Sequence, residues 1–537
     1  MKRMIGIGPV TARPTTYAQH GMISTPHYLA SQVGIRVLQE GGNAVDAAIA
    51  ANATLNVLLP QQCHTGGDLF ALVWNPADES LAGLNASGPA PAGASVDQIR
   101  SLGYQAIPER GALAVTVPGT VAGWAALADR YGTRGLDELL QPAAAYARDG
   151  FPMSAKLVRA VDILGPLLDQ FEEAGRVFRP NGVPAPGDIL RQPALATTFD
   201  RIRRDGPSGF YEGPVAADIV RTLRAGGSAM TEDDFAAYQP EWVTPLSVSY
   251  RGVELVELPP NTQGPMALLL ANIAEGWPVT EIGHTTTAGV HAYSEAVRRA
   301  LVERNNYIAD PGKADVPVER FMDKQAAAAH REAIDRRRPS GIRAESEPGD
   351  TVYLCAVDGD GLAISLIQSV YMGFGSGVLA PESGVLLQNR GFSFSLDPSH
   401  PNAIAGGKRP RHTLIPAMLL RDGKPWTVFG CMGGDAQAHI HLQLLIGLVD
   451  YGLDPQSAIE APRWIAGSDP QGEPLLILES RFGQSVAQDL YDIGHQVEVG
   501  AEWDQRTGHS QIIQIDRERG VLAGGADPRG DGAAVGW

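Results

Sequence analysis

Residues 349–358 read GDTVYLCAVD, and residues 362–370 read LAISLIQSV. Between them stands Asp358-Gly359-Asp360-Gly361, and two apolar runs joined by a DG turn are a strong β-hairpin signal. Both runs are apolar at successive positions, so neither face of the hairpin is expected to meet water. The sequence therefore predicts a hairpin inside a sheet that is covered on both sides.

The segment before this hairpin has the opposite character. Residues 312–350 are rich in Arg, Ala, Glu and Pro, and residues 336–350, RRRPSGIRAESEPGD, contain almost nothing to bury. Such a composition predicts a mobile surface segment. Thr351 stands where this segment meets the buried strand, although many threonines that open strands are there only as good β-formers.

Thr351 could act as a catalytic nucleophile if the peptide bond between Asp350 and Thr351 is cut. A threonine hydroxyl is a poor nucleophile unless a base lies beside it, and the freed α-amine supplies that base on the same residue. An α-amine has a reference pKa of about 8, so a useful fraction is neutral at pH 7. The hairpin also places Ser369 beside Thr351, whether its loop has two or three residues.

Gly433-Gly434 is a second motif that suits this chemistry, because it lies between an apolar strand and a helix expected from about Ala436 to Tyr451. Two backbone N–H groups at a helix N-terminus can hold the oxyanion of a tetrahedral intermediate. An ordinary strand-to-helix turn would have the same sequence. Further helices are expected at 27–58, 119–150, 265–275 and 286–309, and their alternation with strand-like runs predicts sheets between helical layers.

Two other motifs are less decisive. Gly66-Gly67-Asp68 follows a buried helix, where a Gly-Gly turn either brings the backbone close to another element or is only a tight structural turn. His439 and His441 form an HxH pair, but no cysteine or acidic cluster stands at metal-binding spacing, so we expect no metal site. GxSxG and P-loop motifs do not occur in the sequence.

The overall composition argues against several classes of protein. The chain of 537 residues has a formal net charge of -17, whereas a nucleic-acid-binding protein needs a basic stripe. No apolar stretch approaches the roughly 18 residues of a membrane span, and the N-terminus lacks the apolar run of a signal peptide. We therefore predict a cytoplasmic protein that binds neither membrane nor nucleic acid. Three cysteines without a CxxC pair suit a reducing compartment.

Many short motifs are collinear with those of one known family. They lie at residues 41–48, 117–123, 150–152, 349–358, 364–369, 374–377, 384–390, 408–410, 432–434 and 450–452. With these motifs the chain resembles the γ-glutamyltranspeptidase family of N-terminal-nucleophile hydrolases. The resemblance implies an α+β fold, a four-layer αββα sandwich.

The resemblance also implies a precursor that cleaves itself. A large subunit, residues 1–350, and a small subunit, residues 351–537, would stay associated, and two such heterodimers would pair. The resemblance puts Thr351 at the nucleophile, Ser369 at a second threonine that hydrogen-bonds the nucleophile, and Gly433 and Gly434 at the oxyanion-hole glycines. No dissociable cofactor is implied.

The departures from the family pattern fall in the substrate pocket. Residues 85–91, NASGPAP, lack the arginine with which typical γ-glutamyl enzymes hold the substrate α-carboxylate. In residues 388–394, QNRGFSF, an aspartate that helps to hold the α-amino group is lost and Arg390 is gained. An arginine fork suits a carboxylate or an oxamate-like anion and serves an α-ammonium group poorly. This segment resembles the branch with oxamate amidohydrolase and cephalosporin acylase-like proteins.

We therefore predict an autoprocessing amidohydrolase that cleaves a small oxamate-, glutaryl- or γ-glutamyl-like amide through an N-terminal threonine acyl-enzyme. Two alternatives stay open: a true γ-glutamyltransferase or glutathione hydrolase, and an uncleaved, inactive relative that binds a small ligand. The expected substrate-binding residues are Arg390, Tyr371, His412, Thr413 and Asn389.

Overall fold

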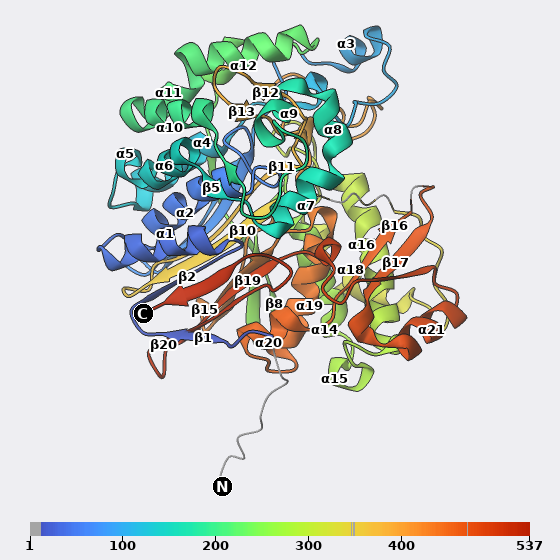
Figure 1. Cartoon of the computed structure of the whole chain (residues 1–537). Coiled ribbons are helices and arrows are strands. Elements are labelled where there is room, and N and C mark those ends of the chain that lie inside the picture. Colours follow the sequence, from blue (N-terminus) through green and yellow to red (C-terminus); the bar gives the residue numbers. More distant parts are fainter. Residues whose placement is uncertain (1–11, 345, 347–348, 470) are drawn as a thin grey trace.

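Two antiparallel sheets lie face to face in the computed structural model, which describes residues 12–344, 346, 349–469 and 471–537 (Figure 1). Each has seven strands, and we name them the β10 sheet and the β15 sheet. The β10 sheet has the order β21 (Ala533–Gly536), β2 (Gly21–Thr25), β10 (Asp350–Asp358), β11 (Ala363–Tyr371), β3 (Asp68–Asn75), β4 (Ser80–Ala86) and β7 (Glu241–Val243). The β15 sheet has the order β1 (Thr16–Ala18), β20 (Val521–Ala526), β19 (Ser510–Asp516), β15 (Lys424–Cys431), β14 (Ala417–Arg421), β9 (Val253–Glu257) and β8 (Leu246–Tyr250).

The predicted hairpin is β10 and β11, near the middle of its sheet. The N–H of Asp358 donates to the carbonyl of Leu362, which leaves residues 359–361 as the loop. Tyr353 belongs to the core between the two sheets, whereas Val352 and Leu354 belong to the core under the helices. Successive side chains of a strand point to opposite faces, and both faces here are covered, so the strand is apolar throughout.

One helical layer covers the outer face of the β10 sheet. Its innermost member is the Ala-rich α2 (Ala44–Leu58), all 15 residues of which are buried. The small side chains let this helix lie close to the sheet, and Asn43 begins it with a capping box. Around it lie α1 (Tyr28–Gln39), α4 (Thr120–Tyr131), α5 (Leu136–Leu139), α6 (Gln141–Asp149), α10 (Pro193–Asp205) and α12 (Gly213–Ala225).

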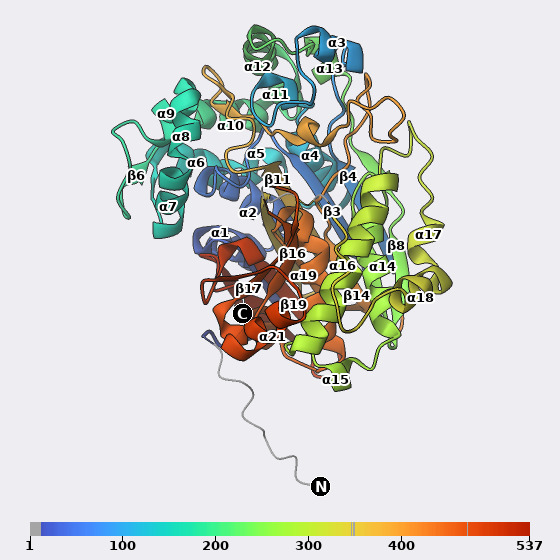
Figure 2. The ribbon, with the colours of Figure 1, turned by 90° about the vertical axis from the view of Figure 1, so that its right-hand side faces the viewer.

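A second helical layer covers the β15 sheet (Figure 2). It comprises α14 (Gly264–Glu275), α16 (Thr287–Tyr307), α19 (Gln437–Val449) and α20 (Pro455–Glu460). Beside it stands a small sheet of β16 (Trp464–Ser468), β17 (Pro474–Glu479) and β18 (Val497–Gly500), with α21 (Gln484–Asp492). The order helix, sheet, sheet, helix is the α+β, four-layer αββα sandwich, and this expectation is confirmed.

One expectation about the segment before Thr351 was wrong in part. Residues 312–350 were expected to be a mobile surface segment, but α17 (Glu319–Met322) and α18 (Lys324–Glu332) pack on α14. Phe321 of α17 and Ala327 of α18 are fully buried there, so one apolar side chain from each helix fixes a stretch that is otherwise mostly polar. Residues 345, 347 and 348 of that segment lie outside the described residues.

Candidate active site

Two hydroxyl groups meet at the peptide bond before Thr351. Thr351 is the second residue of β10 and is 1% exposed. Its Oγ1 lies 2.6 Å from the carbonyl oxygen of Asp350 and 3.2 Å from Ser369 Oγ. Ser369 Oγ donates to the same carbonyl oxygen at 2.5 Å. Both hydroxyls therefore contact the bond that the sequence analysis predicts to be cut.

A β-bulge fixes this geometry. Asp350 pairs with Tyr371 and Val352 pairs with Gln368, so one residue of β10 faces two of β11. Bulges bend a strand and re-aim its side chains. The N–H of Tyr371 donates to Ser369 Oγ at 2.7 Å, and the φ of Tyr371 is 78°. A non-glycine residue in this left-handed region of backbone conformation stores roughly 1–3 kcal/mol of strain, and such strained residues cluster at functional sites.

Gly433 and Gly434 lie against the same stretch of backbone. They follow β15 and have φ values of 146° and 56°, which favour glycine. A Cβ atom on Gly349 would stand 2.9 Å from the Cα of Gly434, so the two backbones touch. Gln263 Nε2 donates to the carbonyl of Gly434 at 3.1 Å and holds this loop. The expected oxyanion glycines are therefore next to the residues that precede Thr351.

A neighbouring loop supports the two glycines. The N–H of Met432 donates to the carbonyl of His509 at 2.8 Å, and a Cβ on Gly508 would stand 2.3 Å from the carbonyl oxygen of Met432. Arg463 donates to the carbonyls of Thr507 and Gly508 at 3.3 and 2.9 Å. The position of the glycine loop thus depends on residues 507–509.

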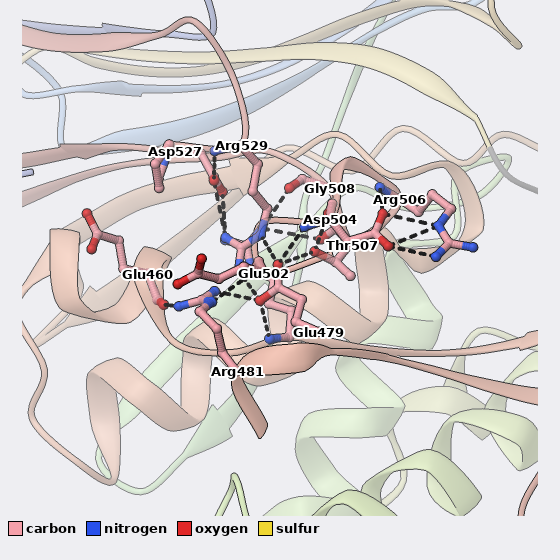
Figure 3. A network of polar contacts seen from close by, with 12 residues as sticks. Glu460, Glu479, Arg481, Glu502, Asp504, Arg506, Thr507, Gly508, Asp527 and Arg529 are labelled. Carbon is pink, nitrogen blue, oxygen red and sulfur yellow. Dashed lines mark hydrogen bonds and ion pairs between the residues drawn. The ribbon is translucent and has the colours of Figure 1, made fainter. Parts of the chain in front are cut away.

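Buried ion pairs anchor that loop (Figure 3). The fully buried Glu479 accepts from Arg529 at 2.6 and 2.7 Å and from Arg481 at 2.5 Å. It also accepts from the hydroxyl of Thr507 at 3.2 Å. Removing one partner from a buried charge pair is costly because the other charge is left uncompensated. The network therefore anchors the loop beside the glycines.

The sequence-predicted substrate residues form a closed polar cluster behind the hairpin. The guanidinium carbon of Arg390 lies 3.4 Å from the centroid of the Tyr371 ring. Arg390 Nη2 donates to Thr413 Oγ1 at 2.8 Å. Arg390 is 2% exposed, and Tyr371, His412 and Thr413 are equally buried. The structure thus brings these four residues together and covers them with protein.

His412 and Asp68 add a hydrogen-bonded pair to this cluster. His412 Nδ1 accepts from the N–H of Leu414 at 3.2 Å, so Nε2 carries the ring proton and faces Asp68 Oδ2 at 3.2 Å. Burial and the charge of Arg390 hold the pKa of His412 well below its usual value. Burial raises the pKa of Asp68 to about 7, although the N–H of Gly88 and Arg390 act to lower it. His412 is therefore neutral, and Asp68 titrates near neutral pH.

Asn389 was also expected to bind substrate, but its side chain is engaged within the chain. Its Oδ1 accepts from the N–H of Met372 at 3.2 Å, and its Nδ2 donates to the carbonyl of Glu109 at 2.8 Å. These bonds tie the end of β11 to residue 109. In the described structure Asn389 holds the loop that carries Arg390.

A large cavity opens beside the scissile bond. Its volume is about 710 Å³. It is lined by Gly349, Asp350 and Gly433, by the polar residues Gln62 and Arg110, and by the loop around His509, whereas Arg390 does not line it. The open space next to Thr351 is therefore on the side of Arg110.

Sequence reasoning missed three of these polar residues. Asp68 pairs with Ser369 across β3 and β11, and a Cβ on Gly67 would stand 2.3 Å from the carbonyl oxygen of Ser369. The Gly-Gly turn therefore does bring its backbone close to the strand that carries Ser369, and this signal could have identified Asp68. Gln62 and Arg110 lie in loops, and nothing in their local sequence marks them.

The HxH pair has partners of its own. His441 Nδ1 lies 2.8 Å from Glu257 Oε1, and the ring of His439 stacks with Trp464 at 6.5 Å between centroids. No group of three or more metal-binding side chains occurs in the described ranges. The two histidines therefore pack inside the molecule, on α19 behind the glycine loop.

Comparisons with known proteins identify the family of the chain. The chain is 42% identical over 521 residues to the glutathione hydrolase-like YwrD proenzyme of Bacillus subtilis, covering 96% of this chain and 98% of that protein. It is 38% identical over 529 residues to the oxamate amidohydrolase proenzyme of Klebsiella pneumoniae, with coverage of 96% and 98%. The solved structure of the cephalosporin acylase from Bacillus halodurans superposes with a TM-score of 0.90 at 38% identity, covering 100% and 99% of the two chains.

These matches confirm the resemblance drawn from the motifs, including the branch with oxamate amidohydrolase and cephalosporin acylase. Among the helices of the described residues, none combines the length and the apolarity that crossing a membrane would need. The family model described as gamma-glutamyltranspeptidase matches residues 30–537. The chain therefore belongs to the γ-glutamyltranspeptidase family, with the fold of the N-terminal-nucleophile hydrolases.

Proposed function

We propose that the chain is an amidohydrolase that first cleaves itself before Thr351. Thr351 Oγ1 adds to the carbonyl carbon of Asp350, the C–N bond breaks as the hydroxyl proton passes to the Thr351 nitrogen, and an ester joins the two residues. Water then hydrolyses the ester, which leaves a carboxylate on Asp350 and a free amine on Thr351. The observation that carries this proposal is the convergence of the Thr351 and Ser369 hydroxyls on the Asp350 carbonyl oxygen.

In the mature enzyme the amine of Thr351 takes the proton from its own hydroxyl as the hydroxyl attacks the substrate amide. The N–H groups of Gly433 and Gly434 stabilise the oxyanion, and Ser369 orients the nucleophile. The amine then passes the proton to the leaving nitrogen. Attack by water releases the acyl group and restores the enzyme.

Self-cleavage would leave two interlocked fragments, residues 1–350 and 351–537. In the β10 sheet the hairpin of β10 and β11 lies between β2 and β3, which belong to the other fragment. Separation would break five strand ladders, β2–β10, β3–β11, β2–β21, β1–β20 and β9–β14, and open both cores, so we expect the fragments to stay associated. The pairing of two heterodimers and the cytoplasmic location stay predictions.

We further propose that Arg390, Tyr371, His412 and Thr413 contribute to the substrate pocket once Gly349 and Asp350 have withdrawn from the nucleophile. Tyr371, which faces Asp350 in the strand register, separates Arg390 from the scissile bond. A permanent positive charge at this position favours an acyl group with an anionic end. Asn389 contributes by holding the loop of Arg390.

The substrate is therefore a small amide with an anionic acyl group. A true γ-glutamyl enzyme is the nearest alternative, but residues 85–91 contain no arginine for an α-carboxylate. The similarity to an oxamate amidohydrolase and a cephalosporin acylase supports the amidohydrolase.

The test is to assay the purified protein against oxamate, a glutaryl amide and a γ-glutamyl amide. We expect the kcat/KM for the γ-glutamyl amide to be at most about one tenth of the highest value in the series. A tenfold reduction corresponds to the loss of about one hydrogen bond to a charged group, here the missing contact to the α-carboxylate. A γ-glutamyl amide hydrolysed as well as the others would contradict the choice of substrate. An intact chain that hydrolyses none of them would favour the inactive ligand-binding relative.

A further inference from the structure

The side chain of Asp350 occupies a small polar site at the edge of the large cavity. Gln62 and Arg110 line the same cavity as Asp350, and a Cβ on Gly373 would stand 3.0 Å from Asp350 Oδ2. Burial raises the pKa of Asp350 to about 6, while a hydrogen bond from Gln62 and the charge of Arg110 act to lower it. The cavity lining thus offers an amide donor and a cation near this carboxyl group.

Arg110 is held in place by the main chain. Its Nη1 donates to the carbonyl of Gly373 at 2.8 Å and also to the carbonyl of Gly375. Its Nε pairs at 2.9 Å with Glu109, which is half exposed and therefore screened by water. A guanidinium fixed in this way is preorganised to meet a carboxylate, because little side-chain freedom is lost on binding.

Asp350 marks the place of the acyl group. In the proposed self-cleavage its carbonyl carbon becomes bonded to Thr351 Oγ1, so the first ester that this protein forms is an aspartyl ester. Every later acyl-enzyme has its acyl carbon on the same oxygen atom. The groups that line the cavity together with Asp350 therefore lie where the acyl chain of a substrate extends.

The backbone on the N-terminal side of Asp350 does not mark such a site. It runs to Gly349, which touches Gly434 and so covers an expected oxyanion group until it withdraws. Gln62 and Arg110 line the cavity of about 710 Å³ beside Gly433. These two side chains remain in the lining once Gly349 and Asp350 have withdrawn. Arg390 lies outside this lining and donates to Thr413, so its charge would add to the positive potential of the pocket, whereas the direct contact with a substrate carboxylate would fall to Arg110.

We propose that Gln62 and Arg110 form a carboxylate subsite for the far end of the substrate's acyl group. This proposal rests on the proposed function and names its substrate class: half-amides of short dicarboxylic acids. In Asp350 two carbon atoms separate the carboxyl carbon from the carbonyl carbon, which is the spacing of a succinyl group. Four-carbon half-amides therefore fit best and five-carbon ones next, whereas oxamate is too short to reach Arg110.

The experiment compares kcat/KM for oxamate, succinamate, glutaramate and uncharged butyramide. For the wild type we expect succinamate to exceed butyramide by at least about tenfold, the worth of one charge-assisted hydrogen bond. Arg110→Gln should remove about tenfold of that preference, mainly through KM, whereas Arg110→Lys should keep part of it. Arg176→Gln, an exposed arginine on α9 (Glu172–Phe178), is the matched control and should change nothing.

A structural role for Arg110 would lower the rates on succinamate and butyramide equally, so an unchanged ratio in Arg110→Gln overturns the subsite. Failure of the proposed function looks different, because the wild type would then stay uncut or hydrolyse no amide in the series. Binding of succinate by calorimetry adds a test without turnover. We expect binding to the cleaved wild type and none to Arg110→Gln or to uncleaved Thr351→Ala, in which Asp350 fills the subsite. Equal binding to all three proteins would overturn the proposal.

Discussion

Ser369→Ala tests the two-hydroxyl arrangement at the scissile bond. Ser369 Oγ donates to the Asp350 carbonyl oxygen at 2.5 Å, and that oxygen carries the negative charge when Thr351 attacks. Loss of one preorganised donor to such an oxyanion slows a reaction by about 10²–10³-fold. We therefore expect self-cleavage of Ser369→Ala to slow by this factor.

The same substitution has a limited cost for folding. The N–H of Tyr371 loses its 2.7 Å acceptor, and an unsatisfied buried donor costs about 1–3 kcal/mol. A domain with about 5–15 kcal/mol of stability stays folded after this loss. Ser369→Thr keeps the hydroxyl and is the matched control, which we expect to cleave at close to the wild-type rate.

The assay is a time course of intact mass during expression and after purification, which gives the fraction of the 56.9 kDa chain that remains. Circular dichroism of the uncut protein confirms that the variant is folded. Cleavage of a folded Ser369→Ala protein within about threefold of the wild-type rate would refute the argument, because a lost oxyanion donor costs far more.

Two further predictions concern stability. Glu479→Gln leaves Arg529 without a full counter-charge and should lower the free energy of unfolding in urea by about 3–5 kcal/mol. The matched control is Glu498→Gln at an exposed ion pair, which should cost under about 1 kcal/mol. Equal losses in the two variants would contradict the role of burial. Burial raises the pKa of Asp68 to about 7 in the folded protein. Between about pH 4 and pH 7 the folded wild type therefore holds a proton that the unfolded chain has released. The contribution of Asp68 to the free energy of unfolding falls as pH rises over that range. Asp68→Asn lacks this dependence, so its deficit relative to wild type should shrink over that range in urea unfolding; a constant deficit would contradict the assignment.

The sequence predicted the centre of the fold better than its periphery. The hairpin of β10 and β11 could be predicted because both strands are long, apolar and joined by a local turn. By contrast β21 reads AAVG and forms a strand only because β2 lies beside it. The short strands β8 and β9 likewise depend on pairing, β9 with β14 and β8 with β9, which local patterns do not encode.

The same distinction applies to the site. The contact of Thr351 with Ser369 follows from the length of one loop and could be predicted by counting residues. The contact of His412 with Asp68 joins residues 344 positions apart, and Arg110 reaches the cavity from a loop without a motif. Those side chains meet only through the packing of the two sheets. The resemblance supplied positions for some pocket residues, but their closure behind Tyr371 required the structure.

The most direct test of the central claim is the intact mass of freshly purified wild type beside Thr351→Ala. We expect two wild-type fragments, scaled by residue count to about 37 and about 20 kDa, the smaller beginning at Thr351, and a single uncut chain for the variant. A folded wild type that remains a single 56.9 kDa chain would contradict the account, because Thr351 would then have no free amine to act as its base.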